Sequence, residues 1–437
     1  MTMLGELERG RTPAAAVDAG TGLTNTHGVL RFITAGSVDD GKSTLIGRLL
    51  HDSRAILEDQ LAAVQRASQK RGTEEIDLSL LTDGLEAERE QGITIDVAYR
   101  YFATPRRKFI IADTPGHEQY TRNMVTAAST ADAAVILVDA RKGILPQTKR
   151  HLYIANLLGI RHLVVAVNKM DLVGYERAVF DAVRRDLTAF AAPLSAANLR
   201  FVPISALRGD LVVERGSAMP WYDGATLLEI LEGIHEEDAA ATQPLRFPVQ
   251  LVSRPGAAGG VRGYMGRIDS GSLRPGAGVT VLPAGRGNAV TGIATLDGGQ
   301  SIAVAGDAVT LTLRDELDIS RGDMLVDPAH PPRVAKYVEA LVCWLSDEPF
   351  SPGGRYLLKH TTRTVKARIS AFNYRVDIHA LQRDPAPGAI AMNDIAHLSL
   401  SLNQPIFCDA YRENRATGSF ILIDEASNHT VAAGLVL

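Results

Sequence analysis

A short glycine-rich run near the start of the chain has the residue types and spacing of a phosphate-binding loop. Residues 36–44 read Gly-Ser-Val-Asp-Asp-Gly-Lys-Ser-Thr, which fits the pattern G-x-x-x-x-G-K-S/T. The glycines let successive backbone N–H groups converge on one anion, and a following helix adds the positive end of its dipole. We predict that Lys42 lies beside the β- and γ-phosphates of a nucleoside triphosphate and that the Ser43 hydroxyl binds Mg²⁺. The predicted loop comprises Gly36, Ser37, Val38, Asp39, Asp40, Gly41, Lys42, Ser43 and Thr44.

A second group of polar residues follows an apolar-leaning run at 108–112 and reads Asp-Thr-Pro-Gly at 113–116. An aspartate at the end of a strand can hold the hydration shell of a nucleotide-bound Mg²⁺, and we assign Asp113 this role, through water. Gly116 has no side chain to keep its N–H away from a γ-phosphate. These residues are also typical of an ordinary turn, so the assignment depends on the phosphate loop upstream.

The third group is predicted to select the base. Residues 168–171 read Asn-Lys-Met-Asp after the apolar run 163–167, and residues 205–207 read Ser-Ala-Leu after the run 201–204. A carboxylate at Asp171 can accept hydrogen bonds from the N1–H and the exocyclic amine of guanine. Adenine lacks the N1 proton and would leave a buried carboxylate unpaired, which is costly. A backbone N–H of the second segment would complete a guanine pocket formed by Asn168, Lys169, Asp171, Ser205, Ala206 and Leu207.

The elements that must position these groups follow an alternating order. From residue 30 to about residue 234, apolar strand-like runs alternate with stretches of helical periodicity. The runs at 133–139 and 163–167 are almost continuously apolar, as in a parallel sheet covered on both faces. The polar groups follow strands, where ligands bind in doubly wound α/β folds. We predict strands at 30–35, 108–112, 133–139, 163–167 and 201–204, and helices at 43–50, 147–158 and 175–187.

The remainder of the chain differs in composition and in its predicted secondary structure. An acidic and alanine-rich linker at 236–244 precedes short alternating strands at 247–253, 263–269, 278–282 and 308–313, a pattern typical of a small antiparallel barrel. A second β-rich stretch follows. Residues 52–80 form an insertion without an assigned role, in which Leu57, Leu61 and Val64 share one helical face. We predict a flexible tail at 1–27, a phosphate-loop GTPase domain at 28–240, and β-barrel domains at 245–334 and 335–437.

Length and composition restrict the function further. With 437 residues, of which 46% are hydrophobic, the chain can build about three domains with real cores. A net charge of −4 does not favour a nucleic-acid partner. The start of the chain lacks the features of a secretory signal, and no apolar run reaches the roughly 18 residues of a membrane span. Cys343 and Cys408 lack metal-type spacing, so buried free thiols in a reducing cytoplasm are expected.

These residues together resemble a known family. The phosphate loop, the run Glu-Gln-Gly-Ile-Thr-Ile at 90–95, residues 113–117 and residues 168–171 are similar to those of translation-factor-type GTPases, which include elongation factor Tu. Ser37 and Asp40 stand where elongation factors usually carry histidines. With the stretches 81–99 and 113–125, they resemble the GTP-hydrolysing large subunit of the bacterial two-subunit sulfate adenylyltransferase.

The resemblance implies roles for residues beyond the three groups. Thr94 would close on Mg²⁺ and the γ-phosphate, and His117 would orient the attacking water. With Lys42, these two residues form the expected catalytic set, and Ser43, Thr94 and Asp113 form the expected Mg²⁺ set. Val38 and Ile93 would form either an apolar gate in front of His117 or ordinary core packing, and the sequence leaves both alternatives open.

The resemblance also implies a partner and a coupled reaction. GTP hydrolysis would drive the formation of adenosine 5′-phosphosulfate and pyrophosphate from ATP and sulfate in sulfate assimilation, with adenylyl transfer on a separate catalytic small subunit. The chain carries one phosphate-loop motif, so a second nucleotide site is not assigned to it. Two alternatives remain: a translational GTPase that delivers aminoacyl-tRNA, and a regulatory switch without coupled chemistry.

Overall fold

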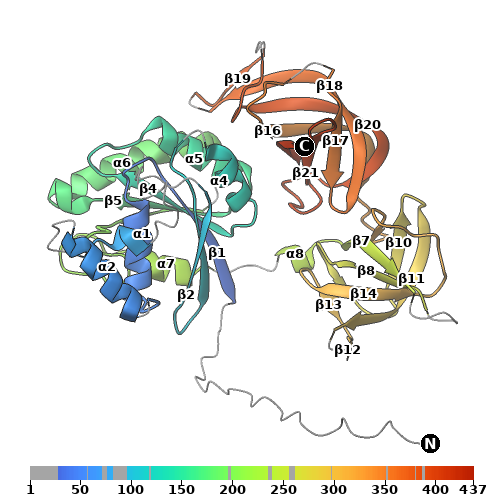
Figure 1. Ribbon diagram of the computed structural model, residues 1–437, viewed down its shortest axis with the longest axis horizontal. Coiled ribbons are helices and arrows are strands. Elements are labelled where there is room, and N and C mark those ends of the chain that lie inside the picture. Colours follow the sequence, from blue (N-terminus) through green and yellow to red (C-terminus); the bar gives the residue numbers. More distant parts are fainter. Residues whose placement is uncertain are drawn as a thin grey trace, which may run out of the picture.

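The structure is a computed structural model that describes residues 28–56, 58–70, 76–81, 96–117, 120–194, 198–234, 239–254, 261–296, 298–350, 353–378, 380–385 and 389–437. The predicted tail, Leu57, Ile93 and Thr94 lie outside these ranges. Figure 1 shows a helix-flanked sheet followed by two β-barrels. This is the predicted architecture of a phosphate-loop domain with two antiparallel barrels.

The first domain is built on a six-stranded sheet with the strand order β2-β3-β1-β4-β5-β6. All neighbouring strands are parallel except β2, which pairs antiparallel with β3 at one edge. Every residue of β4 is buried, as its continuous apolar sequence predicts. The strands are β1 (Val29–Ala35), β2 (Ala98–Ala103), β3 (Lys108–Asp113), β4 (Ala133–Asp139), β5 (His162–Asn168) and β6 (Asn198–Pro203).

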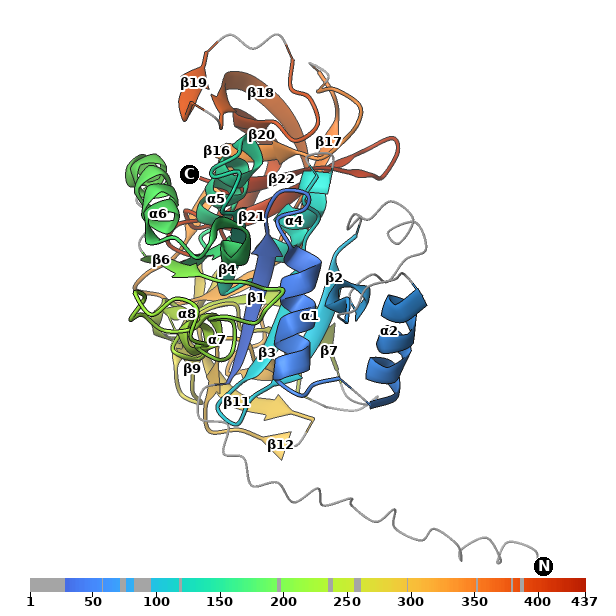
Figure 2. The ribbon, with the colours of Figure 1, turned by 90° about the vertical axis from the view of Figure 1, so that its left-hand side faces the viewer.

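Helices cover both faces of this sheet. α1 and α7 lie on one face, and α4, α5 and α6 lie on the other (Figures 1 and 2). α1 turns Leu45, Ile46 and Leu49 toward the sheet, and all three are fully buried. The helices are α1 (Lys42–Asp52), α2 (Glu58–Lys70), α4 (Thr121–Ala128), α5 (Pro146–Leu157), α6 (Arg177–Ala191) and α7 (Leu227–Glu232), with 3-10 turns η1 (Leu78–Leu81) and η3 (Met170–Val173).

The insertion after α1 folds back onto that helix. α2 supplies the helix predicted there, and its Val64 is buried. The turn η1 presses its backbone against α1 at Gly47, where a Cβ atom would lie only 2.2 Å from the Leu78 carbonyl oxygen. A glycine is therefore needed at this contact.

The first barrel closes through hydrogen bonds between β10 and β11, in the strand order β10-β15-β7-β8-β14-β11. Closure leaves no free sheet edge among these strands. The predicted strands all form, whereas β11 and β15 were not predicted. The strands are β7 (Arg246–Ser253), β8 (Gly263–Arg267), β10 (Gly278–Leu282), β11 (Arg286–Thr295), β14 (Ala308–Leu313) and β15 (Met324–Val326). The predicted linker contains a short helix, α8 (Ala239–Thr242), whose Ala240 carbonyl accepts from the Gly271 N–H at 2.7 Å.

The second barrel closes in the same way, between β17 and β18, in the order β17-β21-β22-β16-β20-β18. Its core gathers around Trp344, Leu358, Leu398 and Leu422. The strands are β16 (Arg333–Trp344), β17 (Tyr356–His360), β18 (Arg363–Asp377), β20 (Ile395–Cys408), β21 (Ser419–Asp424) and β22 (Thr430–Val436).

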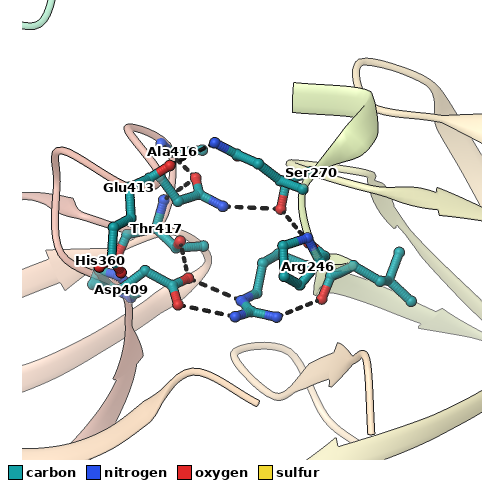
Figure 3. A network of polar contacts seen from close by, with 11 residues as sticks. Arg246, Ser270, His360, Asp409, Glu413, Ala416 and Thr417 are labelled. Carbon is teal, nitrogen blue, oxygen red and sulfur yellow. Dashed lines mark hydrogen bonds and ion pairs between the residues drawn. The ribbon is translucent and has the colours of Figure 1, made fainter. Parts of the chain in front are cut away.

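A buried polar network joins the two barrels (Figure 3). The Arg246 guanidinium at the start of β7 donates two hydrogen bonds of 2.9 Å each to the two carboxylate oxygens of Asp409, just after β20. Asp409 also accepts from the Thr417 hydroxyl at 2.6 Å, and the Thr417 carbonyl contacts His360 Nε2 at 2.7 Å. Bidentate arginine–carboxylate pairs fix orientation as well as distance, so the network holds the barrels in a defined relation.

The same loop, residues 409–418, also reaches the first domain. The Tyr411 hydroxyl donates to the Leu158 carbonyl at 2.8 Å, and Arg415 donates to the carbonyls of Ala128 and Ser129 at the carboxyl end of α4. A cation at a helix carboxyl terminus complements the helix dipole.

Beside the Tyr411 and Arg415 contacts, an apolar seam brings Val125, Ile154 and Leu158 of the first domain against second-barrel side chains that include Cys343 and Leu435. Cys343 and Cys408 are free and buried, as predicted, and burial raises the pKa of Cys343 to about 12.

No helix among the described residues is long and apolar enough to cross a membrane.

Candidate guanine-nucleotide site

The phosphate loop lies between the carboxyl end of β1 and the amino end of α1, the context that its motif requires. Gly41 adopts a left-handed conformation with φ 95° immediately before the helix. The Ser37 N–H donates to Asp40 Oδ2 at 2.7 Å, which ties the loop across its own turn. Lys42 Nζ donates to the carbonyls of Gly36 and Ser37 at 3.1 and 3.2 Å. The lysine is therefore held inside the loop and is buried, and burial lowers its pKa.

The residues after β3 pack directly on this loop. A Cβ atom at Gly116 would lie 2.5 Å from Lys42 Nζ and 2.7 Å from the Gly36 carbonyl oxygen. Any larger residue would therefore displace the lysine or the loop. Asp113 is buried, and it accepts from the Thr34 hydroxyl at 3.0 Å across the β1–β3 ladder. The predicted neighbourhood of Lys42, Asp113 and Gly116 is present.

The protein donors that would face a metal ion are few. Ser43 lies in the first turn of α1, Asp113 ends β3, and no group of three or more histidine, cysteine or acidic side chains suited to a metal occurs within the described ranges. One hydroxyl and one carboxylate suit Mg²⁺, which usually keeps several waters and takes its other ligands from phosphates. The donor set therefore fits a nucleotide-borne Mg²⁺.

The residues predicted to select the base meet beside the phosphate loop. Asn168 bridges the two halves of the site, because its Nδ2 donates to the Asp40 carbonyl at 2.8 Å and its Oδ1 accepts from the Ala206 N–H at 2.9 Å. The Ser205 hydroxyl donates to Asp171 Oδ1 at 2.6 Å and orients that carboxylate. Lys169 Nζ donates to the Asp39 carbonyl, and the Leu207 side chain is exposed.

Two residues that support this arrangement were not predicted. Asp139 ends β4, and its buried carboxylate binds Arg141 Nη2 at 2.7 Å and Lys169 Nζ at 3.1 Å. Burial raises the pKa of Asp139, but the hydrogen bonds from Arg141 and Lys169 outweigh it and hold the pKa below its usual range. The sequence contains one sign of its role, because Asp139 ends a strand at the same edge of the sheet as Asp113. The other residue, Arg48 on α1, donates to the carbonyls of Ala206 and Leu207, and nothing in its spacing marks it.

The residues predicted to act on the γ-phosphate are less completely described. His117 is exposed, and its ring lies 6.2 Å from that of Tyr120, centre to centre. Val38 is half-buried in the phosphate loop. Thr94 and Ile93 lie outside the described residues, so the roles of His117 and Thr94 and the gate formed by Val38 and Ile93 stay predictions.

Comparison with known proteins defines the class. The elongation factor Tu GTP binding domain matches residues 27–237, and a GTP-eEF1A C-terminal domain-like family matches residues 337–437. A solved structure of sup35 complexed with GDP aligns over 94% of both chains, at 23% identity and a TM-score of 0.43. The fold and the matched families thus define a GTPase of the elongation factor Tu type.

Closer relatives define the particular family. Sulfate adenylyltransferase subunit 1 of Laribacter hongkongensis is 55% identical over 94% of this chain and 85% of its own length. The protein of the same name from Chromobacterium violaceum is 55% identical over 94% of this chain and 86% of its own length. The bifunctional enzyme CysN/CysC of Mycobacterium tuberculosis is 53% identical over 94% of this chain and 67% of its own. The chain belongs to the sulfate adenylyltransferase subunit 1 family.

Proposed function

We propose that this chain is the GTP-hydrolysing subunit of a sulfate adenylyltransferase. Hydrolysis of GTP is coupled to the formation of adenosine 5′-phosphosulfate and pyrophosphate from ATP and sulfate on a catalytic partner subunit. The observation that carries the proposal is 55% identity, over almost the whole chain, to proteins named sulfate adenylyltransferase subunit 1. The convergence of Lys42, Asn168 and Asp171 on one sheet edge supports it.

The site suits phosphoryl transfer to water. The transition state for β–γ cleavage is loose, so the protein mainly positions groups and stabilises charge. Lys42 and the backbone N–H groups of the phosphate loop bind the β- and γ-phosphates, and the Gly116 N–H approaches the γ-phosphate. Ser43, Thr94 and Asp113, the last through water, would hold Mg²⁺, which neutralises phosphate charge when bound. His117 orients the attacking water.

The base half of the site provides selectivity for guanine. Asp171, oriented by the Ser205 hydroxyl, accepts from the N1–H and the exocyclic amine of the base. Asn168 holds this half against the phosphate loop. Adenine would leave the Asp171 carboxylate without these donors, and a site built for a hydrogen bond rejects an analogue that lacks it strongly. ATP therefore binds on the partner, where adenylyl transfer takes place.

The proposal places the chain in a heteromer in the cytoplasm. Reduced buried thiols and substrates such as GTP and ATP suit that compartment. A net charge of −4 gives no support to binding of aminoacyl-tRNA, the function of the alternative class.

The test is reconstitution with the partner. The tagged chain is co-expressed with a sulfate adenylyltransferase small subunit and purified, and pyrophosphate release from ATP and sulfate is measured with and without GTP. We expect co-purification and GTP-stimulated release, and a Lys42→Ala chain that co-purifies but gives no stimulation. Co-purification of aminoacyl-tRNA, or release that is indifferent to GTP, would contradict the proposal.

A further inference from the structure

Arg48 makes contacts that link the two halves of the nucleotide site. It lies on α1, six residues after Lys42 and so about 9 Å further along the helix axis. Its Nε donates to the Ala206 carbonyl at 3.1 Å, and its Nη2 donates to the Leu207 carbonyl. Its Nη1 lies 3.5 Å from Asp52 Oδ1, one helical turn further on. One guanidinium therefore joins the phosphate-binding helix to the base-selecting loop.

The loop that Arg48 holds is short and tightly folded. The Gly209 N–H donates to the Ser205 carbonyl at 2.8 Å, and Gly209 has a left-handed φ of 88°. A Cβ atom at Gly209 would lie 3.5 Å from Asp52 and 3.6 Å from Arg48, so the loop backbone packs directly against these two side chains. Residues 205–209 thus rest on the side of α1 while Ser205 orients Asp171.

We propose that Arg48 is a positioning residue for guanine recognition. It fixes the loop 205–207 at a set distance from the phosphate loop, so that the Asp171 carboxylate meets the base when Lys42 holds the phosphates. Asn168 forms the inner link between the two halves, from the Asp40 carbonyl to the Ala206 N–H, and Arg48 forms the outer link. The inference rests on the proposed binding of GTP and deepens it.

The geometry predicts which property the residue controls. Arg48 contacts backbone carbonyls of the base-selecting loop, whereas Lys42 contacts carbonyls of the phosphate loop. Loss of Arg48 therefore loosens the hold on the base and leaves the hold on the phosphates. Hydrogen bonds from a charged donor are among the stronger ones. Their loss should weaken GDP and GTP binding by about tenfold to hundredfold.

The experiment uses the full-length chain and three variants. Binding of a fluorescent GDP analogue is titrated, GTP and ITP are measured by competition, and single-turnover hydrolysis is followed at saturating GTP. ITP lacks the exocyclic amine that is expected to donate a hydrogen bond to the Asp171 carboxylate. For Arg48→Ala we expect weaker GDP and GTP binding, a smaller preference for GTP over ITP, and an unchanged hydrolysis rate at saturation. Arg48→Lys, which keeps the charge but not the forked donor geometry, should fall between wild type and Arg48→Ala.

Arg177→Ala is the matched control. Arg177 also pairs with an aspartate one turn away, since its Nε lies 3.3 Å from Asp181 Oδ2, but it is exposed on α6. The Arg177→Ala variant should bind all three nucleotides with the affinity of the wild type. Wild-type affinity in Arg48→Ala, or equal losses for GTP and ITP with the preference intact, would overturn the inference while the proposed function stood. Failure of the wild-type chain to bind GDP would overturn both.

Discussion

Replacing Arg246 with methionine tests whether the two barrels are held together by a buried charge pair. The Arg246 side chain is 4% exposed and that of Asp409 is 13% exposed, so water screens the pair poorly. The substitution removes both 2.9 Å hydrogen bonds and leaves a largely buried carboxylate without its cation. Breaking one side of a buried pair typically costs about 3–5 kcal/mol in free energy of unfolding, and we expect a loss of that size.

The assay must report on the barrels alone, because a chain with several domains does not unfold in one step. The chain has two tryptophans: Trp221 in the first domain and Trp344 in the second-barrel core. Urea unfolding is therefore followed by Trp344 fluorescence in a Trp221→Phe background. A chain carrying both Arg246→Met and Asp409→Leu should recover most of the lost stability, since an apolar pair often replaces a buried ion pair without loss.

The pH dependence gives an independent check of the same reasoning. Burial raises the pKa of Asp409, but the hydrogen bonds from Arg246 and Thr417 outweigh it, so the net pKa is lowered. A carboxyl group whose pKa is lowered in the folded protein stabilises the fold at pH values above its ordinary pKa, and this stability is lost as the pH falls. Arg246→Met loses the hydrogen bonds that lower the pKa of Asp409, so this pKa is higher in the variant than in the wild type. The difference in free energy of unfolding between the two proteins should be full at pH 7, and it should shrink as the pH falls through the higher pKa of the variant toward the lower pKa of the wild type. A difference in free energy of unfolding below about 1 kcal/mol at pH 7, or a double variant that is as unstable as the single variant, would refute the argument.

Three further predictions concern the nucleotide site. Asp171→Asn should weaken GTP binding by about a hundredfold or more and favour xanthosine triphosphate, whose base presents an acceptor in place of the amine; competition titration that finds unchanged base preference would exclude the pocket assignment. His117→Ala should leave nucleotide affinity intact and slow single-turnover hydrolysis by about a hundredfold or more, so normal turnover would remove its catalytic role. Burial raises the pKa of Asp40 to about 6, so the free energy of unfolding falls as the pH rises from about 4 to about 6 and stays lower above that range. Asp40→Asn should therefore stabilise the first domain at pH 8 by up to about 3 kcal/mol and by little at pH 4, followed by Trp221 fluorescence in a Trp344→Phe background; a gain independent of pH would contradict this.

Most strands and helices of the first domain were predictable because their sequences carry a clear local pattern, whereas the short helices α4 and α7 were not predicted. β4 is a continuous apolar run, and α1 follows a glycine and presents a regular apolar face. β2 was not predicted because edge strands are only partly buried, and its Tyr99 and Tyr101 are exposed. Likewise, α8 is too short for helical periodicity to show, and it depends on a tertiary hydrogen bond to Gly271.

The residues of the nucleotide site also fall into those that could be predicted from the sequence and those that could not. The positions of the phosphate-loop residues were predictable because their backbone geometry restricts residue type, as at Gly41 and Gly116. Arg48 was not, because a cation on a helix surface is ordinary in sequence, and its role depends on carbonyls 158 and 159 residues away. Asp139 could be predicted only from the pairing of β4 with β5. These strands end at the same edge of the sheet, where Lys169 contacts the Asp139 carboxylate.

The position of Cys343 gives the molecule a built-in reporter. Its thiol lies in the apolar seam between the first domain and the second barrel, beside Val125 of α4, whereas Cys408 lies in the core of the second barrel. A thiol-specific dye can reach Cys343 only when the seam parts, while Cys408 requires the barrel itself to open. The labelling rate of Cys343 therefore measures, without any engineered probe, how often α4 and the barrel separate, and how the bound nucleotide alters that rate.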